Sequence, residues 1–150
     1  MAIPPASEVP GRPAAGLGRR LGAMLYDTLL VFAVWLVTIF ALTAANRFQA
    51  VSGAWFQTFL FLEAFGFFAF FWMRDGQTLG MRAWRLRLIA NNGGDLTLNQ
   101  VTIRLMTAMV SFAALGLGYW WCLVDPQRRT WPDLASDTSI VVDAPYNDEI

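Results

Sequence analysis

Residues 21–45 read LGAMLYDTLLVFAVWLVTIFALTAA, and this stretch decides the class of fold. It carries a single charge, that of Asp27. A helix rises about 1.5 Å per residue, so about 20 apolar residues are enough to cross the hydrocarbon of a bilayer. The stretch is long enough for that, and too long for the apolar part of a cleaved signal peptide. We interpret it as a retained first transmembrane span.

Two further apolar runs have the same character. Residues 54–73 contain one charge, Glu63, and residues 105–124 contain none. Trp55 and Trp72 bracket the first of these runs, as expected of residues near lipid headgroups. The charged fraction of the chain is 15%, well below the roughly 25% of soluble domains. Three such runs would leave too little polar surface to cover them in water. We predict an all-α membrane protein with about three transmembrane helices.

The basic residues predict the orientation of these helices. Most of them lie in the N-terminal tail, in the loop at 74–104 or directly after the third run, whereas the short loop at 46–53 holds one. The positive-inside rule therefore places the tail and the longer loop in the cytoplasm. We expect a multi-pass protein of a bacterial inner (plasma) membrane with a cytoplasmic N-terminus. All eleven basic residues are arginines: Arg12, Arg19, Arg20, Arg47, Arg74, Arg82, Arg85, Arg87, Arg104, Arg128 and Arg129.

The cytoplasmic loop at 74–104 has features of ordered structure. Residues 78–84 predict a short amphipathic helix with Leu79, Met81 and Trp84 toward lipid. The third helix is expected to start from a cap at Thr97 or at the neighbouring Asp95. The loop is thus expected to carry a helix of its own between the second and third spans.

Two pieces of the chain have the character of β-strands. Residues 85–90 alternate in part and end at a turn-rich Asn-Asn-Gly-Gly sequence, and residues 139–142 are also β-prone. If these pieces pair, both lie on one side of the membrane. Outside the membrane domain at 17–143, we expect a disordered N-terminal tail at 1–16 and an acidic C-terminal tail at 144–150.

The third run leaves two topologies open. Three simple crossings are the expectation, and they would place the C-terminus outside. Arg128 and Arg129 follow the run directly, however, which favours the inside. Gly116 and Gly118 interrupt the run, and a break there would allow a re-entrant segment. If the pieces at 85–90 and 139–142 pair, the run between them must begin and end on the same side, and it cannot be a simple crossing.

Three motifs line up in order along the chain. They are GRRLGAMLYDTLL at 18–30, GQTLGMRAWRLRLIANNGGDLTLNQ at 76–100 and LGLGYWWCLVDPQRRTWPDLASDT at 115–138. Together they resemble the RDD family of small prokaryotic membrane proteins, which is named for one Arg and two Asp. The resemblance implies an integral membrane protein of a kind often considered to take part in transport.

The resemblance also points to particular polar residues. The family's Arg, at the start of the first helix, maps onto Arg20, with Arg19 as its neighbour. The first Asp lies within that helix and maps onto Asp27. The second Asp belongs to the C-terminal motif and maps onto Asp133, with Asp125 as the alternative.

Arg20 and Asp27 are seven residues apart, so they share a face of the helix at about 10.5 Å along its axis. A carboxylate inside an apolar run is costly unless it is paired, protonated or hydrated. We therefore expect a partner for Asp27, either an arginine of the loop at 74–104 or Arg128 or Arg129. The carboxylate would serve either as an ion or proton site or as a clamp that ties the first helix to the cytoplasmic part.

Glu63 lies near the middle of the second run, where the cost of a carboxylate is greatest. One interpretation is a proton-carrying or cation-binding group. The other is a protonated side chain that hydrogen-bonds a neighbouring helix through Thr38, Thr43 or Ser111.

The composition limits the chemistry. The chain has no histidine and one cysteine, Cys122, which removes the commonest base and metal ligand and any internal disulfide. We find no catalytic motif, so we expect no catalytic residues, cofactor or metal site. The formal net charge is zero, and we expect no nucleic-acid partner.

Two functions remain open. The first is a small transporter or ion-coupled carrier that works as an oligomer, because three spans enclose little pathway alone. The second is an accessory or assembly protein that binds another membrane protein or lipid through its cytoplasmic part. The expected partners are the lipid bilayer, further copies of the chain and another membrane protein.

Overall fold

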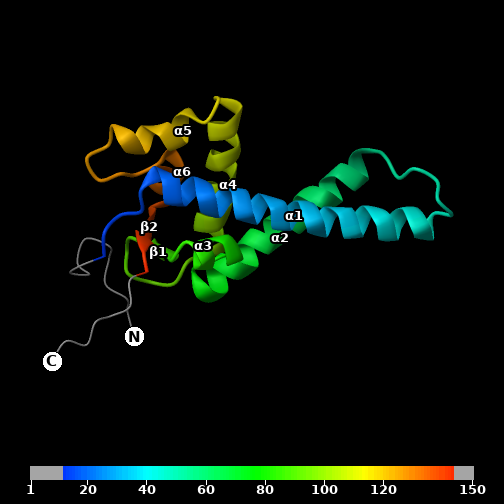
Figure 1. Ribbon diagram of the computed structural model, residues 1–150, viewed down its shortest axis with the longest axis horizontal. Coiled ribbons are helices and arrows are strands. Elements are labelled where there is room, and N and C mark those ends of the chain that lie inside the picture. Colours follow the sequence, from blue (N-terminus) through cyan, green and yellow to red (C-terminus); the bar gives the residue numbers. More distant parts are fainter. Residues whose placement is uncertain (1–11, 144–150) are drawn as a thin grey trace.

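A long helical hairpin projects from a more compact part of the molecule in the computed structural model, which describes residues 12–143 (Figure 1). The hairpin consists of α1 (Leu17–Ala45) and α2 (Ala54–Asp75), and both helices are long and apolar enough to cross a membrane. Within it, the indole Nε1 of Trp35 donates a hydrogen bond of 3.0 Å to the backbone oxygen of Leu60. The bounds of α1 and α2 confirm that the first two predicted spans are helices.

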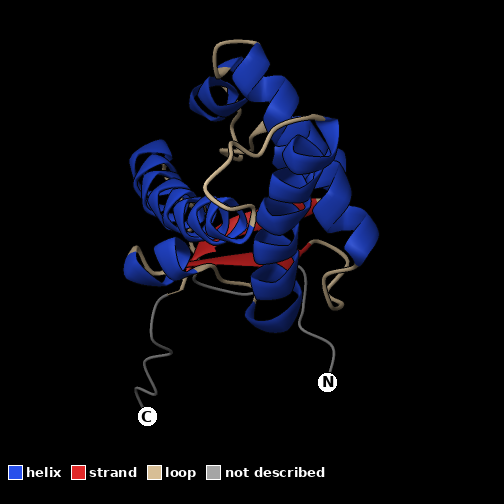
Figure 2. Ribbon diagram, turned by 90° about the vertical axis from the view of Figure 1, so that its right-hand side faces the viewer, coloured by secondary structure: helices blue, strands red, loops and turns tan. Residues whose placement is uncertain are grey.

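The compact part, which we call the cap, contains a two-stranded antiparallel sheet. Strand β1 (Leu86–Ala90) pairs with β2 (Thr138–Val142), and Leu88 lies opposite Ile140. Figure 2, which turns the hairpin toward the viewer, shows the two strands side by side behind the helices. Both strands fall where the alternation and β-propensity of the sequence placed them.

The expectation of a disordered tail at 1–16 is wrong for its last residues. Ala14 forms a bridge with Val141, and the amide of Ala15 donates to the carbonyl oxygen of Ile140 at 3.0 Å. The segment before α1 thus covers the free edge of β2. This contact is made by the backbone, so the amino-acid composition of the segment does not predict it. Residues 1–11, like the acidic tail at 144–150, lie outside the described residues.

Short helices fill the rest of the cap. Helix α3 (Leu79–Ala83) follows the hairpin and begins at Thr78, whose hydroxyl accepts from the amide of Met81. Met81 was expected to face lipid, but its side chain is buried and its sulfur accepts a hydrogen bond from the indole of Trp72 at 3.4 Å. Leu79 and Trp84 are exposed, as the amphipathic pattern predicts.

The third apolar run is bent. Helix α4 (Leu98–Ala113) starts from a capping box at Thr97, and the chain then turns by 106° into α5 (Leu117–Trp120) and the 3₁₀ turn η1 (Trp121–Leu123). Gly116 sits in the bend with a φ of +78°, in the left-handed region that favours glycine. We call this bent unit the elbow; α4 crosses α1 rather than running alongside it (Figure 1).

The third run is therefore not one straight helix: of the helices within residues 12–143, two are long and apolar enough to span, and a third span exists only if the bent pair counts as one. Strand β1 precedes the elbow and β2 follows it, and the two strands are hydrogen-bonded to each other. A hydrocarbon core about 30 Å thick cannot separate paired strands, so the chain enters and leaves the elbow on one side of the bilayer. The class of fold is confirmed: a mostly helical protein with two spanning helices, a third, bent apolar pair and a small sheet.

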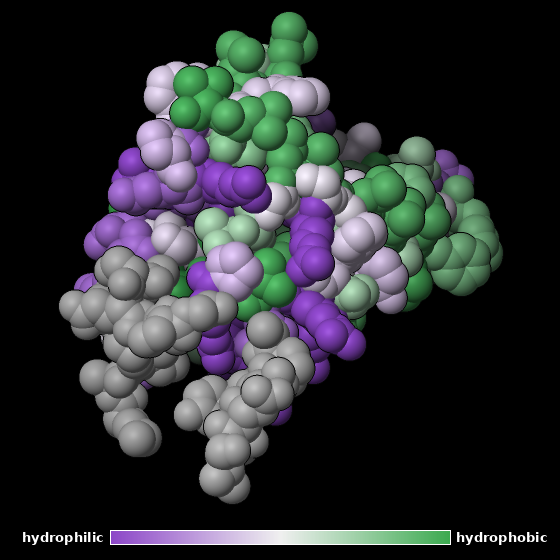
Figure 3. All heavy atoms as spheres, turned by 60° about the vertical axis from the view of Figure 1, so that its left-hand side comes forward, coloured by the Kyte–Doolittle hydropathy of each residue, from purple (hydrophilic) through white to green (hydrophobic). Residues whose placement is uncertain are grey.

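The core lies where the hairpin enters the cap. Ala23 of α1 and Trp72 of α2 pack there with Leu86 of β1 and Val101 of α4. Figure 3 shows hydrophobic residues over the hairpin and at the top of the elbow, with hydrophilic residues gathered between them. Polar elements are thus concentrated at one end of the hairpin, next to the start of α1.

Candidate functional site

Arg20, at the end of the first turn of α1, extends its buried side chain into the cap. Its Nη1 donates to Oδ2 of Asp133 at 2.7 Å. Its Nε donates to the carbonyl oxygen of Ala15 at 3.0 Å, and its Nη2 to that of Arg128 at 3.2 Å. One side chain therefore joins the first spanning helix to two segments of the cap.

A second arginine completes the arrangement. Arg104, on the buried face of α4, donates from Nη1 to Oδ1 of Asp133 at 2.7 Å and to the hydroxyl of Thr138 at 2.8 Å. Its guanidinium carbon lies 5.6 Å from the ring centre of Trp72, within the range of a cation–π contact. Asp133 thus accepts from two helices at once.

Asp133 is fixed by its own helix as well. Helix α6 (Trp131–Ser136) begins at Thr130, and the amide of Thr130 donates to Oδ2 of Asp133 at 2.9 Å. Thr130 and Asp133 form a capping box, in which each side chain accepts from the backbone of the other. The capping box therefore holds Asp133 through bonds that do not involve either arginine.

We call Arg20, Arg104 and Asp133 the buried charge cluster. The side chain of Asp133 is 0% exposed, and those of Arg20 and Arg104 are 3% and 5% exposed. Burial alone would raise the pKa of the Asp133 carboxyl, but the charges of Arg104 and Arg20 outweigh it and hold that pKa below its ordinary value. The cluster ties α1, α4 and α6 together in the ionised state.

Asp27, two turns further along α1, has different partners from those expected. Its carboxylate accepts from the hydroxyl of Thr78 and, at 2.8 Å, from the amide of Gly80. No arginine among the described residues donates to it, so the expected Asp–Arg pairing is wrong. The expected tie between the first helix and the cap exists, but neutral donors at the start of α3 make it.

The tie at Asp27 requires close approach. A Cβ built on Gly80 would overlap the carbonyl oxygen of Ala23 and lie 2.8 Å from Oδ1 of Asp27. Only a glycine lets α3 approach α1 so closely that its backbone amide reaches the carboxylate. Gly80 and Asp27, 53 positions apart in the chain, thus join α3 to α1.

Glu63 lies in the hairpin, away from the cap. The hydroxyl of Thr38 on α1 donates to its Oε1 at 2.7 Å, as one of the sequence-based alternatives predicts. Ser111, another of the expected partners, instead donates to the carbonyl oxygen of Thr107. Oε2 of Glu63 is shielded from solvent and has no hydrogen-bond partner among the described residues.

The remaining candidates lie apart from the cluster. Asp125 accepts from Arg129 at 3.0 Å and from two backbone amides of its own turn. The hydrogen bonds to Arg129 lower the pKa of the Asp125 carboxyl to about 2. Arg19 is exposed at the start of α1. Of the two aspartates considered for the C-terminal motif, Asp133 is the one that contacts Arg20.

Sequence reasoning missed Arg104. It was read only as one of the positive charges that mark the cytoplasmic side. A signal was present: Arg104 follows Val101 by three and precedes Ser111 by seven, so all three share a helix face, and all three are buried. Among the residues described, no group of three or more His, Cys, Asp or Glu is placed to hold a metal ion.

These features define a small multi-spanning membrane protein whose first helix is joined to a polar cap by one buried arginine and two buried aspartates. The sequence matches the model of the RDD family over residues 14–137, and the chain therefore belongs to the RDD family. No curated protein and no solved structure matches it. The family resemblance of the three motifs is confirmed.

Proposed function

We propose that the protein is a small ion-coupled carrier that works as an oligomer, with Glu63 as its proton- or cation-binding group. The observation that supports this is the shielded Oε2 of Glu63, which has no partner among residues 12–143. A buried carboxylate oxygen without a hydrogen bond costs free energy. A proton, a cation or a group from a second copy would remove that cost.

The other carboxylates are poorly suited to carry an ion. Asp133 is held by two arginines, and Asp27 by a hydroxyl and an amide. An ion that entered either site would have to displace partners on which the joint between helix and cap depends. In this proposal Asp27 and Asp133 hold the first helix and the cap together, and Glu63 binds the transported ion.

An oligomer is needed for a pathway. Two spanning helices and an elbow cannot surround a polar route, and Glu63 is hydrogen-bonded to the neighbouring helix of its own hairpin. In this proposal a second copy supplies the opposite wall. The bias of arginines toward the cap favours a cytoplasmic cap and N-terminus in a bacterial inner membrane.

The test is ion flux in proteoliposomes that contain a pH-sensitive dye and are challenged with Na⁺, K⁺ or a proton gradient. Glu63→Gln should abolish ion-driven pH changes, and Glu63→Asp should retain part of them. Asp95→Asn makes the same carboxylate-to-amide change at an exposed cap residue and should leave the flux unaltered. Equal flux in the wild type and in a folded Glu63→Gln variant would contradict the proposal.

A second candidate is an accessory or assembly protein. Its support is the complete internal bonding of Arg20, Asp27 and Asp133, which suits a rigid scaffold. It predicts a stoichiometric complex with a different membrane protein in mild detergent, weakened by changing the exposed cap residues Arg82 and Arg85 to Gln. Recovery of a pure homo-oligomer would favour the carrier instead.

A further inference from the structure

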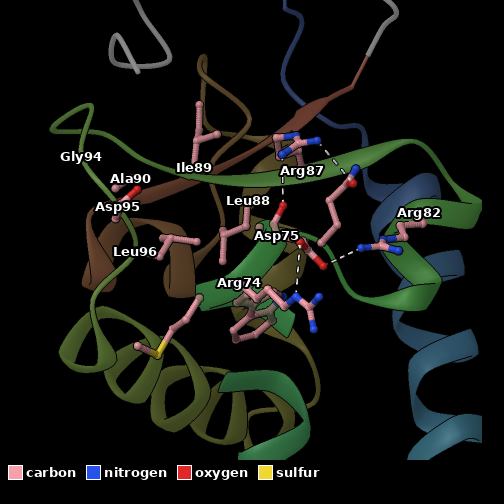
Figure 4. A pocket seen from close by; sticks show the side chains of 14 residues that line it. Arg74, Asp75, Arg82, Arg87, Leu88, Ile89, Ala90, Gly94, Asp95 and Leu96 are labelled. Atoms are coloured by element: carbon pink, nitrogen blue, oxygen red, sulfur yellow. Dashed lines mark hydrogen bonds and ion pairs between the residues drawn. The ribbon is translucent and has the colours of Figure 1, made fainter. Parts of the chain in front are cut away.

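A cavity of about 320 Å³ opens where α2 meets the cap (Figure 4). Three arginines from three elements line it: Arg74 at the end of α2, Arg82 of α3 and Arg87 of β1. Figure 4 shows all three side chains around Asp75, with dashed lines joining each of them to that residue. Two acidic residues, Asp75 and Asp95, line the cavity as well, so arginines outnumber carboxylates there by three to two.

The hydrogen bonds show which arginines have donors to spare. Arg87 donates to the backbone oxygen of Asp75 at 3.0 Å and to Asp143 at 3.2 Å. Arg82 donates from one nitrogen to Oδ2 of Asp75 at 2.6 Å. The side chain of Arg74 comes no closer than 4.0 Å to Asp75, makes no hydrogen bond within residues 12–143 and lies over the ring of Phe70. Arg74 and Arg82 can therefore bind a further anion.

The depth of the cavity relative to the bilayer favours a headgroup. The apolar run of α2 ends at Met73, so Arg74 is the first charged residue beyond the hydrocarbon. Lipid phosphates lie at that level, and a basic residue near an anionic membrane surface contributes about 1 kcal/mol. The side chains of Arg74 and Arg82 are 67% and 49% exposed, so a phosphate can reach both.

A second cavity is apolar. It has a volume of about 490 Å³, lies between α1, α2 and α4, and is lined almost entirely by apolar side chains, including Met24, Phe68 and Met109. Trp72 lines both cavities. An apolar groove within the span and a basic cavity at its cap end thus have Trp72 in common; the groove suits an acyl chain and the cavity a phosphate.

We propose that the protein binds one anionic phospholipid at this place. The phosphate contacts Arg74 and Arg82, and an acyl chain lies in the groove against Trp72. The carboxylate of Asp75 pairs with Arg82 and competes with the phosphate for it. Asp75 is then an internal competitor that lowers the affinity. This binding does not depend on the ion-coupled activity proposed for Glu63.

Native mass spectrometry of the full chain in detergent tests the proposal by titration with phosphatidylglycerol or phosphatidylcholine. Phosphatidylglycerol should bind at a ratio of one and more tightly than phosphatidylcholine. Arg74→Gln and Arg82→Gln should each weaken it about fivefold, and Asp75→Asn should strengthen it. Arg85→Gln, an exposed cap arginine that does not line the cavity, is the matched control and should bind as the wild type does.

Two further arms identify the source of the phosphate and the role of the groove. Ala108→Phe narrows the groove and should weaken phosphatidylglycerol binding without touching the arginines. Inorganic phosphate should compete only at concentrations far above those of the lipid. The proposal would be overturned if the two lipids bound equally, or if the Arg74 and Arg82 variants bound phosphatidylglycerol as the wild type does. It would also be overturned if inorganic phosphate competed as strongly as the lipid.

Discussion

Arg20 and Asp133 are separated by 113 residues and form a hydrogen-bonded ion pair of 2.7 Å in which both side chains are buried. The pair connects the start of the first spanning helix to the last helix of the cap. Arg104 binds the other oxygen of the same carboxylate at 2.7 Å. The relative position of α1, α4 and α6 therefore depends on a single acidic side chain.

The first prediction concerns that carboxylate. Asp133→Asn should destabilise the fold by about 3–5 kcal/mol, because it leaves two buried arginines without their counter-charge. The measurement is the unfolding midpoint in a mild detergent. Asp125→Asn removes another salt-bridged aspartate, whose hydrogen bonds all lie within its own turn, and should lower the midpoint much less. Equal effects of the two variants would show that the cluster does not hold the cap.

The second prediction concerns the joint between α1 and α3. Gly80→Ala should destabilise the protein by about 1–3 kcal/mol, because the new methyl group meets the backbone of Ala23 and the carboxylate of Asp27. Gly18→Ala is the matched control, since nothing lies within 4 Å of a Cβ there. It should be neutral or stabilising by up to about 1 kcal/mol. Thermal unfolding in detergent distinguishes the two; a Gly80→Ala variant as stable as Gly18→Ala would contradict the close contact.

The third prediction concerns the side on which the elbow ends. In a Cys122→Ser background, single cysteines at Asn92, before the elbow, and Gln127, after it, should react with an impermeant maleimide from the same side. Gln49→Cys, in the loop of the hairpin, should react from the other side. All three positions are exposed. Labelling of Gln127→Cys together with Gln49→Cys would restore the three simple crossings.

The fourth prediction is a pH dependence. The pKa of the Asp133 carboxyl is lower in the folded protein than its ordinary value of 3.8. The stability that its ionisation contributes is therefore present above pH 3.8 and is lost as the pH falls through the lower, folded-state pKa. The unfolding midpoint of the wild type should fall on acidification below pH 4. Asp133→Asn should show a shallower fall, and identical slopes would assign the acid sensitivity to other groups.

Local patterns predicted much of the fold correctly. The hydrophobic runs predicted α1 and α2, and the cap at Thr97 predicted the start of α4. The strands at 86–90 and 138–142 were recognisable from alternation and β-propensity. Each of these signals lies within about twenty consecutive residues, and each reports a preference that the segment would have in many folds.

The bend of the third run was harder to predict. Gly116 and Gly118 marked a weak point, but a run without charges reads equally well as a straight span. The decision came from tertiary contacts that the run alone does not reveal. The pairing of β1 with β2 brings its two ends to one side, and Gly118 packs so closely on Ser111 that a side chain there would overlap its hydroxyl.

The sequence by itself determined that this chain is a membrane protein, where its first two spans lie, and that Arg20, Asp27 and Asp133 form the trio of the RDD family. Only the tertiary structure decided the partners. Asp27 bonds a hydroxyl and an amide, and Arg104 joins Arg20 on Asp133. The physical reason is that a buried charge must be satisfied by whichever donors the packing brings near, and those donors come from segments far apart in the chain.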